Sequence, residues 1–297
     1  MKNVLFIALL FIGCKTNTKK DTELAFKIGI IADCQYCDCD ASNTRFYKKS
    51  IAKLETSVDT LNTKQLEYTI HLGDFIDRDY KSFDSVLPIW NRLTSKKHHV
   101  LGNHDFSVAD SLKKTVPKRM NLQSRYYSFL KNNWRFIVLD GNDLSFYGAI
   151  SDKKRQQTDS LFNFLKDKKL PNLQTWNGGI SLAQLKWVKK ELEMAVVEKE
   201  NVGFYCHFPA VKDGEVHNLW NYKQLLALID NYEHVKFYFN GHNHNGDYVL
   251  KNGVHHLTFK GMLDTDNTSA FSTATFTKDS IFITGYGREK SRRLKIK

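Results

Sequence analysis

The stretch Tyr68-Thr69-Ile70-His71-Leu72-Gly73-Asp74-Phe75-Ile76-Asp77 predicts a buried β-strand that stops at a glycine, with carboxylates directly behind the stop. In open α/β sheets, ligands bind at the edge formed by the carboxyl ends of the strands. We interpret Asp74 as the shared ligand of two metal ions, because a carboxylate is negative and offers two oxygens to hard or borderline cations. A single Gly-Asp pair is also typical of an ordinary turn, so this interpretation depends on similar features elsewhere in the chain.

Predicted strands and helices alternate around this stretch. Apolar runs over 26–32, 68–71 and 98–101 predict strands, and apolar residues at helical spacing over about 44–61 and 82–93 predict the helices between them. This order is typical of βαβ units and predicts an α/β fold with a largely parallel sheet. Farther along we expect a hairpin (126–129 with 134–140), helices over about 152–168 and 222–232, and strands over 201–206, 235–239, 254–258, 272–276 and 280–284.

A further helix is predicted to start after residue 180. Ser181 and Gln184 match a capping box, in which each residue binds a backbone N–H of the first turn. The buried stripe of this helix is predicted to consist of Leu182, Leu185, Val188 and Leu192.

Composition and charge narrow the class of protein. The chain has 297 residues, of which 41% are hydrophobic, enough for one large α/β domain with a full core. We expect this domain to span 26–290 and residues 291–297 to form a basic tail. The net charge of +12 suits attraction to anionic lipid or an anionic substrate. No nucleic-acid-binding motif accompanies this charge, so we expect no nucleic acid partner.

The first residues are typical of an export signal. Lys2 precedes an apolar run over 4–12 that is too short to span a membrane and fits the core of a signal peptide. Gly13-Cys14 and the polar residues behind it resemble a bacterial lipoprotein signal, although Phe11 replaces the usual leucine. We therefore expect a signal peptide (1–13), a lipidated Cys14 with a tether (14–25), and an exported protein anchored to a membrane of the bacterial cell envelope. The alternative is an ordinary cleaved signal with an incidental cysteine.

Export would place the remaining cysteines in an oxidising compartment. Cys34, Cys37 and Cys39 are closely spaced, and Cys206 lies far from them. The close spacing resembles half of a zinc site, but a second Cys/His pair at finger spacing is missing. The sequence leaves the disulfide pairing open.

Ligand-type side chains follow five of the predicted strands. They are Asp33 with Gln35, Asp74, Asn103 with His104, His207, and His242 with His244. Each has an ordinary explanation as a turn or surface residue, but a parallel sheet gathers strand ends from distant parts of the chain at one edge. Carboxylate, amide and imidazole donors together suit Mn, Fe or Zn better than Ca.

This set of motifs resembles the calcineurin-like metallophosphoesterase family, over essentially the whole chain after residue 26. The matching segments are Asp33-Cys34-Gln35, Gly73-Asp74, Gly102-Asn103-His104-Asp105, His207 and Gly241-His242-Asn243-His244. Gln35 stands where most members have histidine, which resembles the manganese-dependent ADP-ribose/CDP-alcohol diphosphatase branch. Further stretches similar to that branch are Ile31–Tyr36, Arg45-Phe46-Tyr47, Asn177-Gly178-Gly179-Ile180-Ser181 and Leu219-Trp220-Asn221-Tyr222.

The resemblance implies a fold and a metal centre. The fold would be a β-sandwich of two mixed sheets flanked by helices, with a binuclear metal site at the carboxyl ends of the strands. Asp33, Gln35 and His244 would hold one metal ion, and Asp74 would be shared between both ions. Asn103, His207 and His242 would hold the other ion. Mn is the expected metal, with Fe and Zn as alternatives, and the neutral amide of Gln35 would make its site the weaker one.

The resemblance also implies a mechanism, in which a hydroxide that bridges the metal ions attacks phosphorus. His104 would donate a proton or hydrogen bond to the leaving group, with Asp105 as its orienting partner. Arg45 is a candidate phosphate ligand, because its guanidinium matches phosphate oxygens. The candidates for stacking on a base are Tyr36, Phe46 and Trp220.

The expected substrate is a small phosphorylated compound. The first hypothesis is a hydrolase of nucleoside diphosphate-linked substrates such as ADP-ribose or CDP-alcohols. The second keeps the same metal centre but assigns it another exported substrate, such as a lipid or cell-wall phosphoester, cleaved as a phosphodiester or phosphomonoester. The third is a catalytically inactive surface lipoprotein that only binds its ligand. The sequence does not indicate an oligomeric state.

Overall fold

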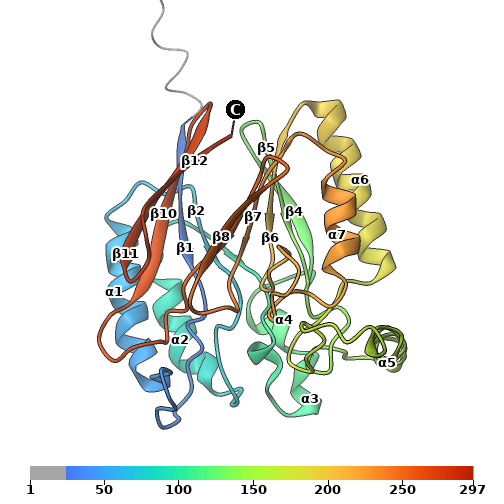
Figure 1. Cartoon of the computed structure of the whole chain (residues 1–297). Coiled ribbons are helices and arrows are strands. Elements are labelled where there is room, and N and C mark those ends of the chain that lie inside the picture. The colour runs from blue at the N-terminus through green and yellow to red at the C-terminus, as the bar shows by residue number, and fades with distance from the viewer. Residues whose placement is uncertain (1–24, 297) are drawn as a thin grey trace, which may run out of the picture.

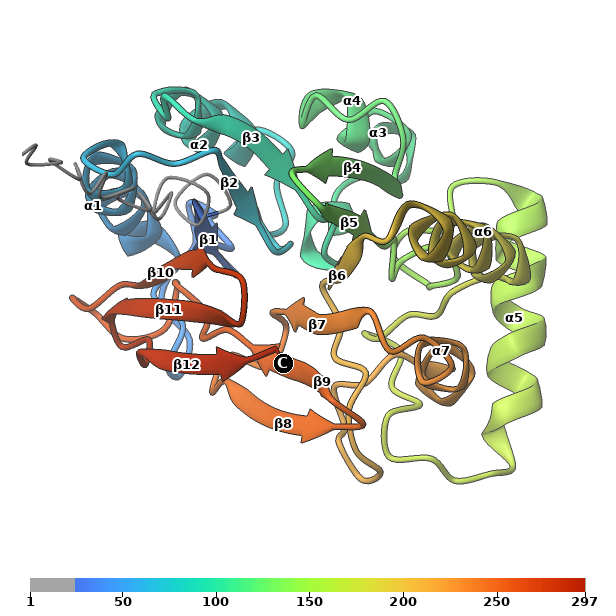
Figure 2. The ribbon, with the colours of Figure 1, turned by 90° about the horizontal axis from the view of Figure 1, so that it is seen from above.

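Two six-stranded mixed β-sheets pack face to face, and helices cover the outer side of each sheet (Figures 1 and 2). The computed structural model describes residues 25–296. The predicted signal peptide, Cys14 and nearly all of the predicted tether therefore lie outside the described residues. Within the described part of the chain, no helix is both long and apolar enough to cross a membrane.

The first sheet has the strand order β12-β11-β10-β1-β2-β3. Its parallel half confirms the predicted βαβ units: β1 (Phe26–Ile31), α1 (Ser50–Asn62), β2 (Tyr68–His71), α2 (Ser82–Asn91) and β3 (Lys96–His99). Its antiparallel half lies on the other side of β1 and comprises β10 (Ala270–Phe276), β11 (Ser280–Gly287) and β12 (Arg292–Lys295).

The second sheet has the strand order β4-β5-β6-β7-β9-β8. The predicted hairpin is present as antiparallel β4 (Tyr127–Lys131) and β5 (Trp134–Val138). Parallel strands follow as β6 (Asn201–Tyr205), β7 (Val235–Asn240) and β9 (Val254–Thr258), and β8 (Asp247–Lys251) forms the antiparallel edge.

Longer helices cover the second sheet, and short ones connect the two halves of the chain. Figure 2 shows α6 and α7 beside this sheet and α5 at its periphery. The bounds are α3 (Asp110–Lys113), α4 (Val116–Arg119), α5 (Asp152–Lys166), α6 (Leu182–Glu198) and α7 (Tyr222–Ile229), with 3₁₀ turns at Tyr47–Lys49 and His104–Phe106.

Aromatic side chains from both sheets fill the space between them. Phe26 of β1 stacks on Phe276 at a ring-centroid distance of 4.6 Å. The hydroxyl groups of Tyr68 and Tyr205, from different sheets, lie 2.8 Å apart. Fully burying one such side chain contributes about 2 kcal/mol. This packing fixes the two sheets relative to each other and therefore fixes the positions of their strand ends.

The end of the chain differs from the prediction. Residues 292–295 belong to the predicted basic tail, yet they form β12 and pair with residues 280–283 of β11. The reason is an apolar pair among the basic residues: Leu294 and Ile296 are buried against the inter-sheet core. Alternation of buried and exposed positions is the pattern of a half-buried edge strand. In the sequence, the basic residues around Leu294 and Ile296 hide this pattern.

The start of α6 also differs in part. Ser181 caps the helix as predicted, because its side chain accepts from the backbone N–H of Gln184. The side chain of Gln184 does not complete the capping box and instead binds both backbone groups of Asp140. Leu182 is 71% exposed and does not belong to the buried stripe, which includes Val188 and Leu192.

The cysteines do not form a zinc site in the described part of the chain. Cys37 forms a disulfide with Cys39, while Cys34 and Cys206 are buried free thiols. Burial raises the pKa of the Cys34 thiol above its usual range. A thiol in such surroundings is inert rather than nucleophilic.

Candidate metal centre

The candidate ligands converge at the carboxyl ends of strands from both sheets. Asp33 follows β1, Asp74 follows β2, His207 follows β6 and His242 follows β7. The three short parallel strands β1, β2 and β3 and the parallel strands of the second sheet all end on this side of the sandwich, at the bottom in Figure 1. Segments from across the chain therefore meet at one edge, as the strand-end argument predicts.

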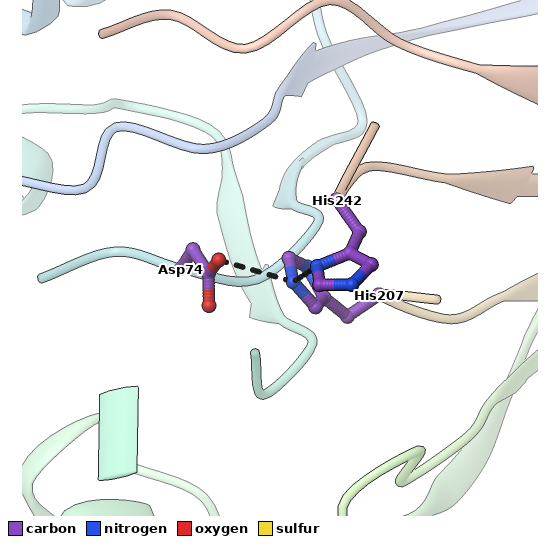
Figure 3. A group of neighbouring side chains, drawn as sticks. All are labelled: Asp74, His207 and His242. Atoms are coloured by element: carbon purple, nitrogen blue, oxygen red, sulfur yellow. Dashed lines mark hydrogen bonds and ion pairs between the residues drawn. The ribbon is translucent and has the colours of Figure 1, made fainter. Parts of the chain in front are cut away.

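One group of donors centres on Nε2 of His207. This nitrogen lies 3.1 Å from Oδ2 of Asp74, 3.1 Å from Oδ1 of Asn103 and 3.1 Å from Nδ1 of His242. Figure 3 shows Asp74, His207 and His242 pointing toward one another from separate segments of the chain. Ligand atoms of these three buried residues all lie within 4.8 Å of one another, a spacing that suits a shared cation.

A second group of donors lies around Asp33. Its Oδ1 is 3.5 Å from Nε2 of His244, and its carboxylate accepts the backbone N–H of His242. Gln35 is fully buried, and its Oε1 has no hydrogen-bond partner among the described residues. A buried, unpartnered amide oxygen costs free energy unless something binds it, and an amide oxygen is an ordinary metal ligand.

Each imidazole is held so that one nitrogen is left for the centre. Nδ1 of His207 donates to the carbonyl of Leu72 at 2.9 Å. Nε2 of His242 donates to Oδ1 of Asn177 at 2.8 Å, and Nδ1 of His244 lies 3.0 Å from Oδ2 of Asp264. The opposite nitrogen of each ring therefore carries a lone pair toward the candidate ligands. This is the tautomer control that histidine metal ligands require.

The electrostatics of the first group also favour a cation. Burial alone lowers the pKa of His207, but the carboxylate of Asp74 raises it to about 9. Burial alone raises the pKa of Asp74, but the imidazoles of His207 and His104 bring it below its usual range. The carboxylate of Asp74 thus favours positive charge at this spot, where a metal ion would supply it.

The backbone is strained where the ligands project. Asp33, Gln35, Asp74 and His242 have φ angles of +50°, +45°, +55° and +67°. A non-glycine residue in this left-handed region costs on the order of 1 kcal/mol or more. Strain of this kind persists only where the surrounding structure imposes it, and it concentrates at functional sites.

Two glycines of the motifs are required by close approach. A Cβ atom at Gly102 would lie 2.1 Å from Oδ1 of Asp74, and one at Gly241 would lie 2.5 Å from Oδ2 of Asp33. Any side chain at these positions would displace a candidate ligand. The Gly-Asn-His and Gly-His-x-His motifs therefore provide the space for the carboxylates as well as donors of their own.

His104 is oriented by a residue that the sequence analysis did not select. Its Nδ1 lies 2.8 Å from Oδ1 of Asp77, and the other oxygen of Asp77 accepts from the side-chain amide of Gln35 at 3.2 Å. Asp105, the predicted partner, is instead buried and accepts the backbone N–H groups of Gly102, Asp74, Phe75 and Ile76. Asp105 thus holds together the two loops that carry Asp74 and Asn103.

A cavity of about 320 Å³ opens onto the candidate ligands. Its wall includes Arg45, the predicted phosphate ligand, and His104, the predicted catalytic group. The remaining lining residues are Asp74, Asn103, Tyr147, Trp176, His217, His242 and His244. His217 is held by Glu215, whose carboxylate lies 2.7 Å from its Nδ1.

The predicted stacking residues are not on this wall. Trp220 is 1% exposed, packs against Phe146 and Phe162, and donates its indole N–H to the carbonyl of Gln174. Tyr36 packs against the apolar cluster between the first sheet and its helices, and half-buried Phe46 also lies off the cavity. The aromatic residues that do line the cavity are Tyr147 and Trp176. Trp176 directly precedes Asn177-Gly178-Gly179, a stretch that the sequence analysis noted as similar to the diphosphatase branch. That proximity was the signal by which Trp176 could have been found from the sequence.

The two-sheet sandwich and the donors at its strand ends define a metallophosphoesterase. A family model described as calcineurin-like phosphoesterase matches residues 26–246. This chain belongs to the calcineurin-like phosphoesterase family, which confirms the predicted family and fold class. The enzyme is therefore a hydrolase of phosphoester or phosphoanhydride bonds with a divalent metal cofactor.

Individual relatives extend this similarity over more than nine-tenths of the chain. The manganese-dependent ADP-ribose/CDP-alcohol diphosphatase of Xenopus tropicalis is 30% identical over 331 residues, covering 93% of this chain and 96% of its own. The human protein of the same name is 27% identical over 326 residues, covering 93% and 94%. The crystal structure of a dimetal phosphatase from Danio rerio has a TM-score of 0.81 at 25% identity, covering 92% of this chain and 99% of its own.

Proposed function

We propose that this enzyme hydrolyses the pyrophosphate bond of nucleoside diphosphate-linked compounds, such as ADP-ribose or CDP-alcohols, with two manganese ions. Gln35 is the observation that carries the proposal: it stands where most family members have histidine, and its buried amide oxygen has no hydrogen-bond partner among the described residues. The relatives described above are named as diphosphatases of this kind. Their similarity covers more than nine-tenths of this chain.

The donor set fits two ions. Asp33, Gln35 and His244 would hold one, Asn103, His207 and His242 would hold the other, and Asp74 would contribute to both. When bound, such ions activate water and neutralise charge on the phosphate oxygens. The strained backbone and the oriented imidazoles keep these donors in place before substrate arrives, which lowers the cost of reorganisation during the reaction.

His104 is the proton or hydrogen-bond donor in this proposal. Its Nδ1 donates to Asp77, so a ring that carries both protons presents Nε2–H to the oxygen of the leaving group. The backbone N–H of His104 also donates to Oδ1 of Asp74 at 2.8 Å. The residue therefore stays next to the metal centre while its ring, 21% exposed, reaches the cavity.

The rest of the cavity would bind the substrate. Arg45 is half-buried on the wall, and its guanidinium suits a phosphate oxygen. Trp176 lies against His217 and His242, with ring-centroid distances of 5.3 Å to each. Its indole is the candidate stacking surface for a nucleobase, in place of the residues proposed from the sequence.

Export and lipid anchoring at Cys14 are part of the proposal. This part rests on the apolar run over 4–12 and on Gly13-Cys14 in the sequence. The direction of β1 is compatible with it, because Phe26 and Asp33 lie toward opposite edges of the sandwich. An anchor ahead of Phe26 would join the molecule at the edge away from the metal centre, at the top in Figure 1. An exported location favours a second candidate, in which the same centre cleaves a lipid or cell-wall phosphoester.

A comparison of substrates tests the proposal. The purified protein with Mn²⁺ is supplied in parallel with ADP-ribose, CDP-choline, bis-p-nitrophenyl phosphate and p-nitrophenyl phosphate, and released products are quantified by chromatography. We expect nucleoside monophosphate from the first two to appear much faster than p-nitrophenol from the others. Preference for a p-nitrophenyl ester would keep the metal centre and reject the diphosphatase assignment.

A further inference from the structure

The segment Gly261–Thr265 supports both residues that would share the metal site with Gln35. The backbone N–H of Leu263 donates to the carbonyl of Asp33 at 3.1 Å, and that of Gly261 donates to the carbonyl of His244 at 3.2 Å. A Cβ atom at Gly261 would lie 2.7 Å from Cγ of His244. The backbone of this segment, which follows β9, therefore packs directly against the imidazole.

Asp264 makes the second contact between the 261–265 segment and His244. Its Oδ2 lies 3.0 Å from Nδ1 of His244, while its Oδ1 accepts from the hydroxyl of Thr44 at 2.7 Å. This short charge contact with Nδ1 favours a ring orientation in which Nε2 points to the other side. Nε2 is the nitrogen that faces Asp33.

Lys53 holds the 261–265 segment from the other side. This lysine of α1 is 5% exposed, and its ammonium lies within hydrogen-bond distance of four consecutive carbonyls. The distances from Nζ are 3.1 Å to Met262, 3.1 Å to Leu263, 3.0 Å to Asp264 and 2.5 Å to Thr265. The charge of a buried ammonium must be compensated by polar partners. Here the main-chain carbonyl oxygens of 262–265 surround it and provide these partners.

We propose that Lys53 is a positioning residue for the metal site of Asp33, Gln35 and His244. It acts through the 261–265 segment and Asp264, and it touches neither metal nor substrate. Because the amide of Gln35 is a weak donor, affinity at this site depends on how well Asp33 and His244 are oriented. The inference rests on the metal dependence in the proposed function and is independent of which substrate the enzyme cleaves.

Manganese binding to metal-free protein, measured by calorimetry without substrate, tests this role. Lys53→Met keeps the length of the side chain and removes the ammonium. We expect one of the two Mn²⁺ dissociation constants to rise about 10–100-fold, the usual effect of losing an outer partner of a metal ligand, and the other to stay unchanged. Equal weakening of both sites, or no change in a folded variant, would overturn the proposal.

Ser57→Ala is the matched control for this experiment. Ser57 lies one turn later on the same face of α1, is fully buried, and donates to the carbonyl of Lys53. Its hydroxyl also lies 3.3 Å from that of Ser269, which is outside the 261–265 segment. We expect both dissociation constants to remain at their original values in this variant. A selective loss of one site here would show that any disturbance of α1 weakens the centre, and would remove the specific role of Lys53.

If Lys53→Met does not fold, a second variant tests the proposal. Asp264→Ala removes the contact with Nδ1 of His244 but leaves the carbonyls around Lys53 in place. We expect the same selective weakening of one Mn²⁺ site, with a cooperative unfolding transition retained. Unchanged binding at both sites would refute the proposed path through Asp264. Failure of the substrate comparison above would leave these binding results unaffected.

Discussion

Nδ1 of His104 lies 2.8 Å from Oδ1 of Asp77, so a carboxylate from the loop of Asp74 orients the imidazole of the next loop. Asp77 is 2% exposed, and its second oxygen receives the side-chain amide of Gln35. One carboxylate thus connects a candidate metal ligand with the candidate proton donor. This contact couples the leaving-group side of the cavity to the metal centre.

His104→Ala should lower kcat on ADP-ribose about 100-fold while leaving the manganese content unchanged, because it removes a donor to the leaving group. Asp77→Asn should lower kcat in the same direction by about 10-fold. Steady-state kinetics with metal analysis of the same samples checks both. Parallel loss of metal and activity would make His104 a structural residue.

Gln35→His should strengthen manganese binding at one site, because imidazole is the stronger donor toward Mn. The original protein should lose that ion during buffer exchange and need added Mn²⁺ for full activity. Elemental analysis after desalting, compared between the two proteins, measures this difference. Two tightly retained ions per chain in the original protein would show that the amide does not weaken the site.

Trp176→Ala should weaken binding of AMP and CMP about 10-fold, since stacking on an aromatic ring contributes about 1–3 kcal/mol per base. Ribose 5-phosphate is AMP without its base, so its inhibition constant should not change. Inhibition constants against one chromogenic phosphoester give all three values. An equal rise for ribose 5-phosphate would show that the substitution disturbs the phosphate site rather than a base-binding surface.

Two buried histidines of β3 should make the fold sensitive to acid. Burial lowers the pKa of His98 to about 4 and that of His99 to about 3. The unfolded chain therefore binds more protons than the native one below pH 6.5, and stability is lost as the pH falls from about 6.5 toward those values. His99→Phe should reduce this loss by about 1.4 kcal/mol per pH unit. Denaturant unfolding of both proteins between pH 7 and 4.5 measures the slope, and identical slopes would contradict the assignment.

The strand ends could be predicted from sequence because two simple rules determine them. A buried apolar run followed by a glycine and a polar residue marks a strand end, and parallel pairing brings such ends to one edge. Asp33, Asp74, His207 and His242 each follow such a buried run, with a glycine directly before Asp74 and His242, and the structure brings the four together. The inference holds however many residues separate these positions along the chain.

The partners of the ligands could not be predicted in the same way. Asp264 lies on the loop that links β9 of the second sheet to β10 of the first, and only the packing of the two sheets brings it to His244. Asp77 is three residues from Asp74, so the sequence places it near the centre. Which of Asp77 and Asp105 contacts the ring of His104 depends on backbone geometry. Trp220 has the composition of a stacking residue and is buried by Phe146 and Phe162, which are distant in sequence.

The central claim is that two metal ions bind at the strand ends with Asp74 between them. Anomalous scattering from crystals grown with Mn²⁺ measures this directly. We predict two manganese peaks, one among Asp33, Gln35 and His244 and the other among Asn103, His207 and His242, with the carboxylate of Asp74 reaching both. A single peak, or peaks that do not contact Asp74, would contradict the account.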